Sequence, residues 1–412
     1  MVATLSSFAV LGLGRFGYTM VLPAMQKGLG LSNTLAGSLA TANLVGYATM
    51  SLVGGALAAR FGTRAVLPVG LVIAAIGMAL TGVAHGFGEA AGWRLVTGIG
   101  TGLTNVPATA LAGAWFARRL RGVASGVVVS GSSIGLIVAG PLVPRVLAAT
   151  GPDGWRMVWW IYGGITAVMA VVAYALLRNR PSDMHLLPVG MVETAAPPGM
   201  AAELAGPSNV PALEAVPGLA EWHAIFRSSI VWHLSLVYFC FGLAYLAFMT
   251  FFTKHLITAG GYSPQAAGDL YMLLGWCTVI SGALWGGVSD RIGRKWAFAA
   301  VCLVQAVSFA LFGLWEAPAG FTTAAVVFGF SAWGIPAIMA ATCGDVFGAR
   351  LAPAALGFVT IFFAVGMAVG PAVAGAIADA TGSFVPAFLL ASVVAVLGAA
   401  AAATLGPTVR RA

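Results

Sequence analysis

Long, uninterrupted apolar runs are the feature that most constrains how this chain can fold. Twelve runs of about 20 residues can be read along it, each long enough to cross roughly 30 Å of hydrocarbon as a helix. They lie at 4–26, 34–58, 66–84, 90–116, 123–149, 155–177, 228–252, 264–288, 296–315, 319–345, 354–380 and 384–406. Because the runs are continuous rather than alternating, and longer than the roughly 10 residues of a barrel strand, they predict helices. We therefore expect an all-α membrane protein with twelve transmembrane helices.

The composition supports this interpretation. Only 8% of the residues are charged and 60% are hydrophobic, whereas about a quarter of a soluble domain is charged. The 55 glycines would weaken helices in water, but in lipid they let helix backbones approach closely. The first run continues into the second without a cleavage site of small residues, so we expect it to be a retained helix.

Basic residues predict the orientation in the membrane. Most of them fall in loops on one side, namely Arg60, Arg64, Arg118, Arg119, Arg121, Arg178, Arg180, Arg227, Arg291, Arg294, Lys295, Arg350, Arg410 and Arg411. Loops on the other side hold only Lys27, Arg156 and Lys254. By the positive-inside rule both termini are expected in the cytoplasm. This topology accounts for the net charge of +8, which is therefore no indication of nucleic-acid binding.

A change of composition divides the chain. Residues 178–227 are rich in Pro, Ala and Gly and are expected to form a cytoplasmic linker, with a possible short interfacial helix at its end, "LAEWHAIFR". The linker separates a six-helix unit at 1–177 from a second one at 228–412. Landmarks recur between the two units at spacings of 229 to 231 residues: Gly55 and Gly286, Gly62 and Gly293, Gly126 and Gly357, Gly140 and Gly370, Pro107 and Pro336. These spacings predict a duplicated unit, which is typical of secondary transporters.

Three stretches carry a family resemblance. "GGVSDRIGRK" (286–295) resembles the cytoplasmic-loop signature of the major facilitator superfamily, "RLVTGIGTG" (94–102) its helix-four signature, and "GFVTIFFAVGMAVGPAVAG" (357–375) its antiporter signature, although here in helix eleven. "GRFGYTMVLPAM" and "AGSLATANLVGYA" are similar to the bacterial YbfB/YjiJ-like branch. The resemblance implies the major facilitator fold and a monomeric carrier in the bacterial inner membrane. It also implies that Asp290 latches the cytoplasmic side beside Arg118, with Arg291 and Arg294 in the same loop.

Arg15 is the main candidate for binding a ligand. It lies about eleven residues from either end of the first run, roughly 16 Å from each surface at 1.5 Å per residue. No Asp or Glu is expected at that depth, and a buried arginine without an acid favours an anionic ligand. Its planar fork suits a carboxylate better than a lysine would. The alternative is a structural arginine tied to helix carbonyls.

Other deep polar and aromatic residues could complete the site. On the helices of the first unit these are Tyr18, Thr19, Asn43, Tyr47 and Asn105, and across from them Tyr245, Tyr271, Trp276 and Trp333. Each aromatic side chain has packing or the membrane interface as its alternative role.

Coupling is less clearly indicated. Asp269 and Glu89 are the acids nearest the path, and Arg94, a further candidate for coupling, has a structural or snorkelling role as its alternative. Proton symport of a small organic anion, a carboxylate above all, is the leading hypothesis. Anion exchange, uniport, a proton-driven multidrug or metabolite exporter, and a channel or sensor remain alternatives. No catalytic motif or metal-ligand cluster occurs in the sequence, so an enzyme, a cofactor and a metal are not expected.

Overall fold

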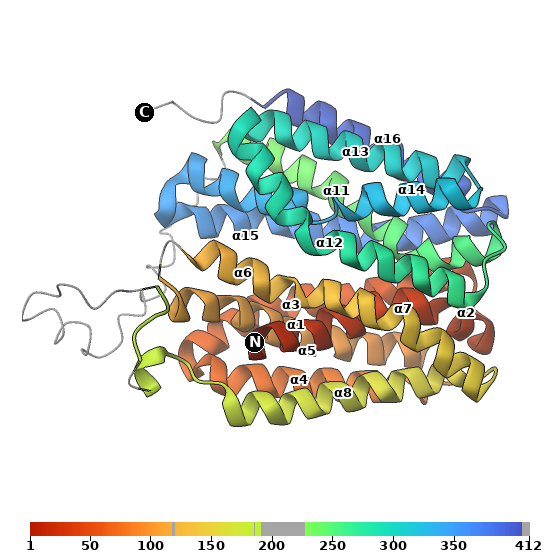
Figure 1. Ribbon diagram of the computed structural model, residues 1–412, viewed down its shortest axis with the longest axis horizontal. Coiled ribbons are helices and arrows are strands. Elements are labelled where there is room, and N and C mark those ends of the chain that lie inside the picture. The colour runs from red at the N-terminus through yellow and green to blue at the C-terminus, as the bar shows by residue number, and fades with distance from the viewer. Residues whose placement is uncertain (118–119, 185, 191–226, 406–412) are drawn as a thin grey trace, which may run out of the picture.

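The chain forms long helices arranged in two groups. This is a computed structural model that describes residues 1–117, 120–184, 186–190 and 227–405. In Figure 1 the red to yellow helices of the first part of the chain lie below the green to blue helices of the second part. Most of the predicted linker, including its possible interfacial helix, lies outside the described residues. The division into units 1–177 and 228–412 therefore remains a prediction.

The helices of the first group alternate with short turns. They are α1 (Val2–Ser7), the π-helix η1 (Phe8–Phe16), α2 (Gly17–Leu29), α3 (Asn33–Phe61), α4 (Thr63–Thr81), α5 (Phe87–Trp115), α6 (Arg121–Val129), α7 (Gly131–Thr150) and α8 (Gly154–Leu176). The short 3-10 helix η3 (Pro181–Met184) follows α8.

The second group repeats this plan. It contains α11 (Ser229–Thr258), α12 (Pro264–Ile292), α13 (Arg294–Leu314), α14 (Pro318–Gly329), α15 (Gly334–Thr381) and α16 (Val385–Ala403). Gly348 interrupts α15 with a φ of 70°, so two helical stretches meet there. In the part of the chain that the structure describes, the one extended pairing is an isolated bridge between Phe116 and Val189.

The all-helical prediction is confirmed, but the number of membrane crossings is confirmed only in part. Ten helical segments among the described residues are long and apolar enough to cross a bilayer. They become eleven if the stretches Asn33–Ser51 and Val53–Phe61, bent by 40°, count as one span. The helix α5 is 29 residues long but is not among these candidates, because polar residues dilute its apolar run. Twelve crossings and cytoplasmic termini remain predictions.

Turns at corresponding positions of the two groups share backbone geometry. Gly62 and Gly293, which the repeat predicted to correspond, have φ values of 83° and 86°, a conformation that glycine adopts at little cost. Gly30 and Gly261 form a second such pair, with φ values of 62° and 66°. Ser32 and Ser263 cap the helices that follow by accepting hydrogen bonds from Leu35 N and Ala266 N. These local signals stop and restart the helices at equivalent points.

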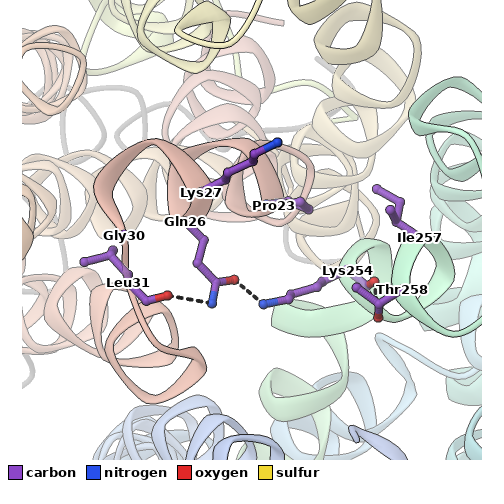
Figure 2. Close-up of a pocket in the computed structure, with 8 residues that line it drawn as sticks. All are labelled: Pro23, Gln26, Lys27, Gly30, Leu31, Lys254, Ile257 and Thr258. Carbon is purple, nitrogen blue, oxygen red and sulfur yellow. Dashed lines mark hydrogen bonds between the residues drawn. The ribbon is translucent and has the colours of Figure 1, made fainter. Parts of the chain in front are cut away.

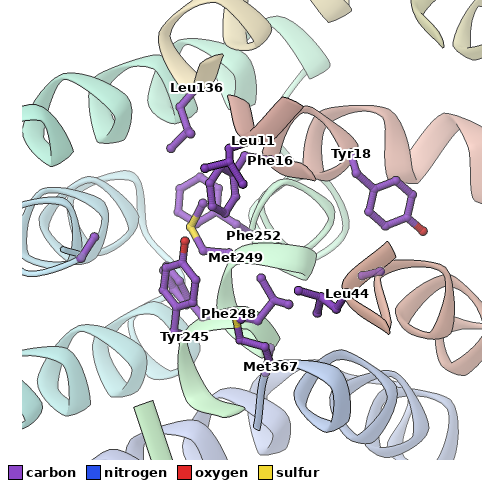
Figure 3. Close-up of a cluster of buried hydrophobic side chains, with 14 of the residues drawn as sticks. Leu11, Phe16, Tyr18, Leu44, Leu136, Tyr245, Phe248, Met249, Phe252 and Met367 are labelled. Atoms are coloured by element: carbon purple, nitrogen blue, oxygen red, sulfur yellow. The ribbon is translucent and has the colours of Figure 1, made fainter. Parts of the chain in front are cut away.

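The two groups meet along an apolar core and along seams of small residues. Figure 3 shows the core, in which Leu11 and Phe16 of η1 lie near Tyr245 and Met249 of α11. In the seams, α3 packs on α15 and α7 packs on α12. A Cβ added to Gly37 would lie 2.2 Å from the carbonyl oxygen of Pro371, and one added to Gly268 would lie 2.2 Å from that of Gly140. Such contacts are possible only without side chains.

Candidate functional site

Arg15 lies in the π-helical segment η1. A π-helix has a wider turn than an α-helix and occurs mostly at functional positions. Two side chains from other helices bind backbone carbonyls beside Arg15: Arg94 Nη1 of α5 donates to Gly14 O at 2.6 Å, and the Tyr271 hydroxyl of α12 donates to Phe16 O at 2.8 Å. The segment that presents Arg15 is therefore held from both groups of helices.

Among the described residues, the guanidinium of Arg15 has an aromatic neighbour but no acidic one. Its Cζ lies 4.2 Å from the centre of the Tyr47 ring, which is a cation–π contact. Its Nε and Nη2 are buried, and among the described residues neither has a hydrogen-bond partner. Buried donors without partners are costly, by about 1–3 kcal/mol or more for a charged group. The hydrogen bonding of the Arg15 guanidinium is therefore incomplete within the described residues.

Two further polar atoms near Arg15 also lack partners. Tyr47 and Tyr245 come from different groups of helices: the Tyr47 ring lies under Arg15, and the centre of the Tyr245 ring lies 6.4 Å from that of Phe16, the residue after Arg15. Tyr245 is 2% exposed, and its hydroxyl has no partner among the described residues. Asn105 donates from Nδ2 to the Tyr47 hydroxyl at 3.3 Å, while its Oδ1 is buried and unpaired. We call Arg15, Tyr47, Asn105 and Tyr245 the central polar cluster.

Arg94, Tyr18 and Asn43 are used differently. Arg94 is 1% exposed, and its guanidinium lies over the rings of Tyr18 and Trp159, at 4.8 and 5.0 Å from their centres. The Tyr18 hydroxyl donates to Ala36 O, and Asn43 Nδ2 donates to Arg94 O. These contacts all lie within the first group of helices, as does the bond from Arg94 to Gly14 O that holds η1 in place. They match the structural alternative for Arg94, and its predicted role in coupling remains untested.

Thr19, Tyr271 and Trp333 join the two groups of helices. Thr19 Oγ1 donates to Met249 O at 2.8 Å, and Trp333 Nε1 donates to the Ser133 hydroxyl at 3.2 Å. The Trp333 ring also contacts Phe16 and Tyr245, with centres 5.8 and 5.9 Å away. These residues therefore wall the central polar cluster.

Trp276 does not lie where the sequence led us to expect it. It is 60% exposed and shares the outer face of α12 with Leu273 and Ile280, which are also exposed. The opposite face of α12 carries Tyr271 and Thr278, which bond Phe16 O and Ser133. Trp276 is therefore not part of the central polar cluster.

The predicted gating residues lie near helix ends. Asp290 accepts from Arg294 Nη1 at 2.6 Å, and Arg294 Nε donates to Asp345 at 2.8 Å, so this cation ties the turn between α12 and α13 to α15. Arg291 is exposed beside them, and exposed Asp269 accepts from Gln265. Arg118 lies outside the described residues, so the latch between it and Asp290 remains a prediction.

Polar contacts at the opposite end of the bundle had not been singled out. The Asp379 carboxylate of α15 accepts from the backbone N–H groups of Asn33 and Thr34, both at 2.8 Å, and from the Thr34 hydroxyl at 2.6 Å. Lys254 of α11 donates to Gln26 and to Asn33. Negative charge is favoured at a helix N-terminus, here that of α3. We call these five residues the outer clasp.

Figure 2 shows a cavity of about 340 Å³ beside the outer clasp, between α2 and α11. Lys254 reaches across it to Gln26, whereas Lys27 points away. Sequence reasoning missed the clasp because polar residues close to helix ends resemble ordinary interfacial residues. The relevant signal is that a lysine, an asparagine and an aspartate all lie within a few residues of predicted turns on the same side.

Metal-binding side chains do not gather in the described part of the chain. No group of three or more His, Cys, Asp or Glu residues there could hold a metal ion. The four cysteines, Cys240, Cys277, Cys302 and Cys343, are buried free thiols.

Comparison with known families gives two matches. The model of the Major Facilitator Superfamily matches residues 4–263. A second model, described as "Uncharacterised MFS-type transporter YbfB", matches residues 204–403. Together they extend over nearly the whole chain.

Curated relatives are distant. The probable sulfoacetate transporter SauU of Cupriavidus necator is 26% identical over 283 residues, which is 69% of this chain and 62% of that protein. The hexuronate transporter of Bacillus subtilis is 25% identical, with the same two coverages. The probable L-galactonate transporter of Escherichia coli is 26% identical over 62% of this chain and 53% of that protein. The chain thus spans less than two thirds of the length of these relatives.

Solved structures share the fold. A bacterial homolog of the human lysosomal transporter Spinster, in an inward-facing and unoccupied conformation, superposes with a TM-score of 0.75. The alignment covers 97% of this chain and 95% of that one at 16% identity.

Proposed function

The chain belongs to the major facilitator superfamily, and from that premise we propose that it is a secondary transporter that binds a small organic anion at Arg15. The observation that carries this proposal is the pair of buried, unpartnered nitrogens of Arg15. A carboxylate would accept from both and would neutralise a charge that the protein leaves unmatched. Relatives named as transporters of sulfoacetate, hexuronate and galactonate support an anionic substrate.

We also propose an orientation in the membrane and a driving force for transport. We place the carrier in the bacterial inner membrane as a monomer of two six-helix units, with the outer clasp facing away from the cytoplasm. Transport proceeds by alternating access to the central polar cluster, and protons that enter together with the anion drive it. The basic loops at the other end of the molecule support this orientation.

Binding measurements on purified variants test the anion site. Screening carboxylates, sulfonates and cationic drugs by thermal shift identifies a ligand, since binding to the folded state raises the melting temperature. Arg15→Ala is expected to lower the affinity for the best carboxylate about a hundredfold or more, because two charge-assisted hydrogen bonds are worth roughly 1.5–3 kcal/mol each. Arg15→Lys keeps the charge but loses the fork, and should bind weakly with poorer discrimination.

The same variants separate binding from folding. The Arg15→Ala protein should express and melt like the parent, because no internal hydrogen bond is lost. An Arg15→Ala protein that melts early but binds the ligand normally would mean that the arginine is structural and would refute the anion site.

A further inference from the structure

The central polar cluster contains more than a receptor for a carboxylate. Beside the donors of Arg15 it holds an acceptor, Asn105 Oδ1, and the hydroxyl of Tyr245, and none of these atoms has a partner in the part of the chain that the structure describes. Asn105 lies in the first group of helices and is held by the Tyr47 hydroxyl, whose ring lies under Arg15. Tyr245 lies in the second group, and its ring packs against that of Phe16, the residue next to Arg15, with ring centres 6.4 Å apart. A ligand that offered only a carboxylate could accept from Tyr245 but could not donate to Asn105 Oδ1.

From these unpaired atoms we infer that the substrate is a hydroxy acid, with a hydroxyl group close to the carboxylate; this inference rests on the proposed anion site at Arg15. A hydroxyl is a small group that donates and accepts at once. It can donate to Asn105 Oδ1 and accept from the Tyr245 hydroxyl, while the carboxylate meets Arg15. One hydroxyl thereby completes the hydrogen bonding of a residue from each group of helices.

Other small acids satisfy the unpaired atoms of Asn105 and Tyr245 less completely. The second carboxylate of a diacid only accepts, so Asn105 Oδ1 would stay unpaired. The ammonium group of an amino acid only donates, and it would place a positive charge near Arg15. The carboxylate of an unsubstituted acid likewise has no donor for Asn105 Oδ1. The expected order of affinity is therefore hydroxy acid, then unsubstituted acid, then amino acid.

Matched acids test this inference on the purified, full-length protein. We would measure the affinities of lactate against propionate and alanine, mandelate against phenylacetate, and 3-hydroxybutyrate against butyrate. In at least one of these sets the hydroxy acid should bind about tenfold or more tightly than its unsubstituted partner, because two additional hydrogen bonds form.

Variants attribute this preference to particular atoms. Tyr245→Phe removes a hydroxyl that makes no hydrogen bond to the described residues, and keeps the ring that packs on Phe16 and Trp333. It should reduce the preference to less than about threefold without lowering the melting temperature. Asn105→Ala should reduce the preference in the same way. Tyr162→Phe is the control: its hydroxyl is also buried without a partner among the described residues, but its ring packs against Trp159 outside the cluster, so this change should keep the preference.

The outcomes separate this inference from the function it rests on. If hydroxy and unsubstituted acids bind equally to the parent protein and both lose affinity in Arg15→Ala, the hydroxy-acid inference is overturned and the anion site stands. If Tyr245→Phe and Asn105→Ala both keep a tenfold preference, the inference is also overturned. If no acid of any set binds the parent protein, the anion site and the inference fall together.

Discussion

Arg15 and Arg94 are both set deep among the helices of the first group, yet their surroundings differ. Arg94 donates to Gly14 O and lies over two aromatic rings, although its Nε lacks a partner. Arg15 has one ring beneath it and two nitrogens without partners. The protein supplies hydrogen-bond acceptors to a structural arginine, whereas an arginine that binds a ligand keeps donors free for that ligand.

The contrast predicts opposite effects on stability. Arg94→Met should destabilise the protein by about 1.5–3 kcal/mol, because a charge-assisted hydrogen bond to Gly14 O is lost. Arg15→Met should leave the melting temperature unchanged or raise it slightly, since a desolvated and unmatched charge is removed. Thermal unfolding of the two matched variants in detergent measures this difference. An Arg15→Met protein that melts as early as Arg94→Met would contradict it.

At the level of elements, the lengths of the helices were predictable and their faces were not. Run length locates a membrane helix well because every backbone group must be bonded within it. A helix that is apolar all round, however, gives no period to show which side faces inward. Trp276 was therefore placed in the site although it is 60% exposed. The π-helical turn of η1 has no sequence signal at all.

The site itself was predictable in part. Arg15 stood out because charges at that depth are rare and costly. Tyr47 and Asn105 were predicted to belong to the site because they lie at a similar depth in their helices. The structure places Tyr47 against Arg15, and Asn105 against Tyr47. The sequence could not reveal that the Tyr18 hydroxyl donates to Ala36 O, because such a bond depends on how neighbouring helices are rotated.

The position of η1 depends on a crossing of two glycines. A Cβ on Gly12 would lie 2.6 Å from Gly135 Cα of α7. Gly12→Leu should therefore push η1 away from α7, move Arg15, and lower both the melting temperature and the anion affinity, the latter by about tenfold or more, since overpacking typically costs 1–3 kcal/mol. Gly92→Leu in α5 is the control, because nothing lies within 4 Å of that position. Equal behaviour of the two variants would show that the crossing does not hold Arg15 in place.

On the scale of the whole molecule, the two groups of helices are closed on each other at the end that bears the outer clasp. Thr41 Oγ1 donates to Ala368 O at 2.5 Å, so α3 and α15 are joined below the clasp as well as at it. Glycines let the backbones of these helices touch, which makes the contact sensitive to any added volume.

A bulky residue in this seam should open that end. Gly37→Leu would bring a side chain against Pro371 O and should favour a state in which α3 and α15 are apart. Spin labels at Asp153→Cys and Gln265→Cys, near the starts of α8 and α12, report the separation by double electron–electron resonance. We expect a longer distance population in Gly37→Leu than in the parent or in Gly92→Leu. Identical distance distributions in all three proteins would rule out this role for the seam.

An arginine without an acidic partner also makes the empty carrier responsive to the voltage across the membrane. A monovalent anion in the central polar cluster matches the charge of Arg15, so the charge that the loaded carrier moves is that of the accompanying proton. When the site is empty, one positive charge remains, and moving a full elementary charge through the field is worth about 2.3 kcal/mol per 100 mV. The field therefore acts on the proton as the loaded carrier turns and on Arg15 as the empty carrier returns. A cell interior that is negative would draw the vacant site towards its cytoplasmic exposure, so the membrane potential would set how long the carrier waits facing outward for its next anion.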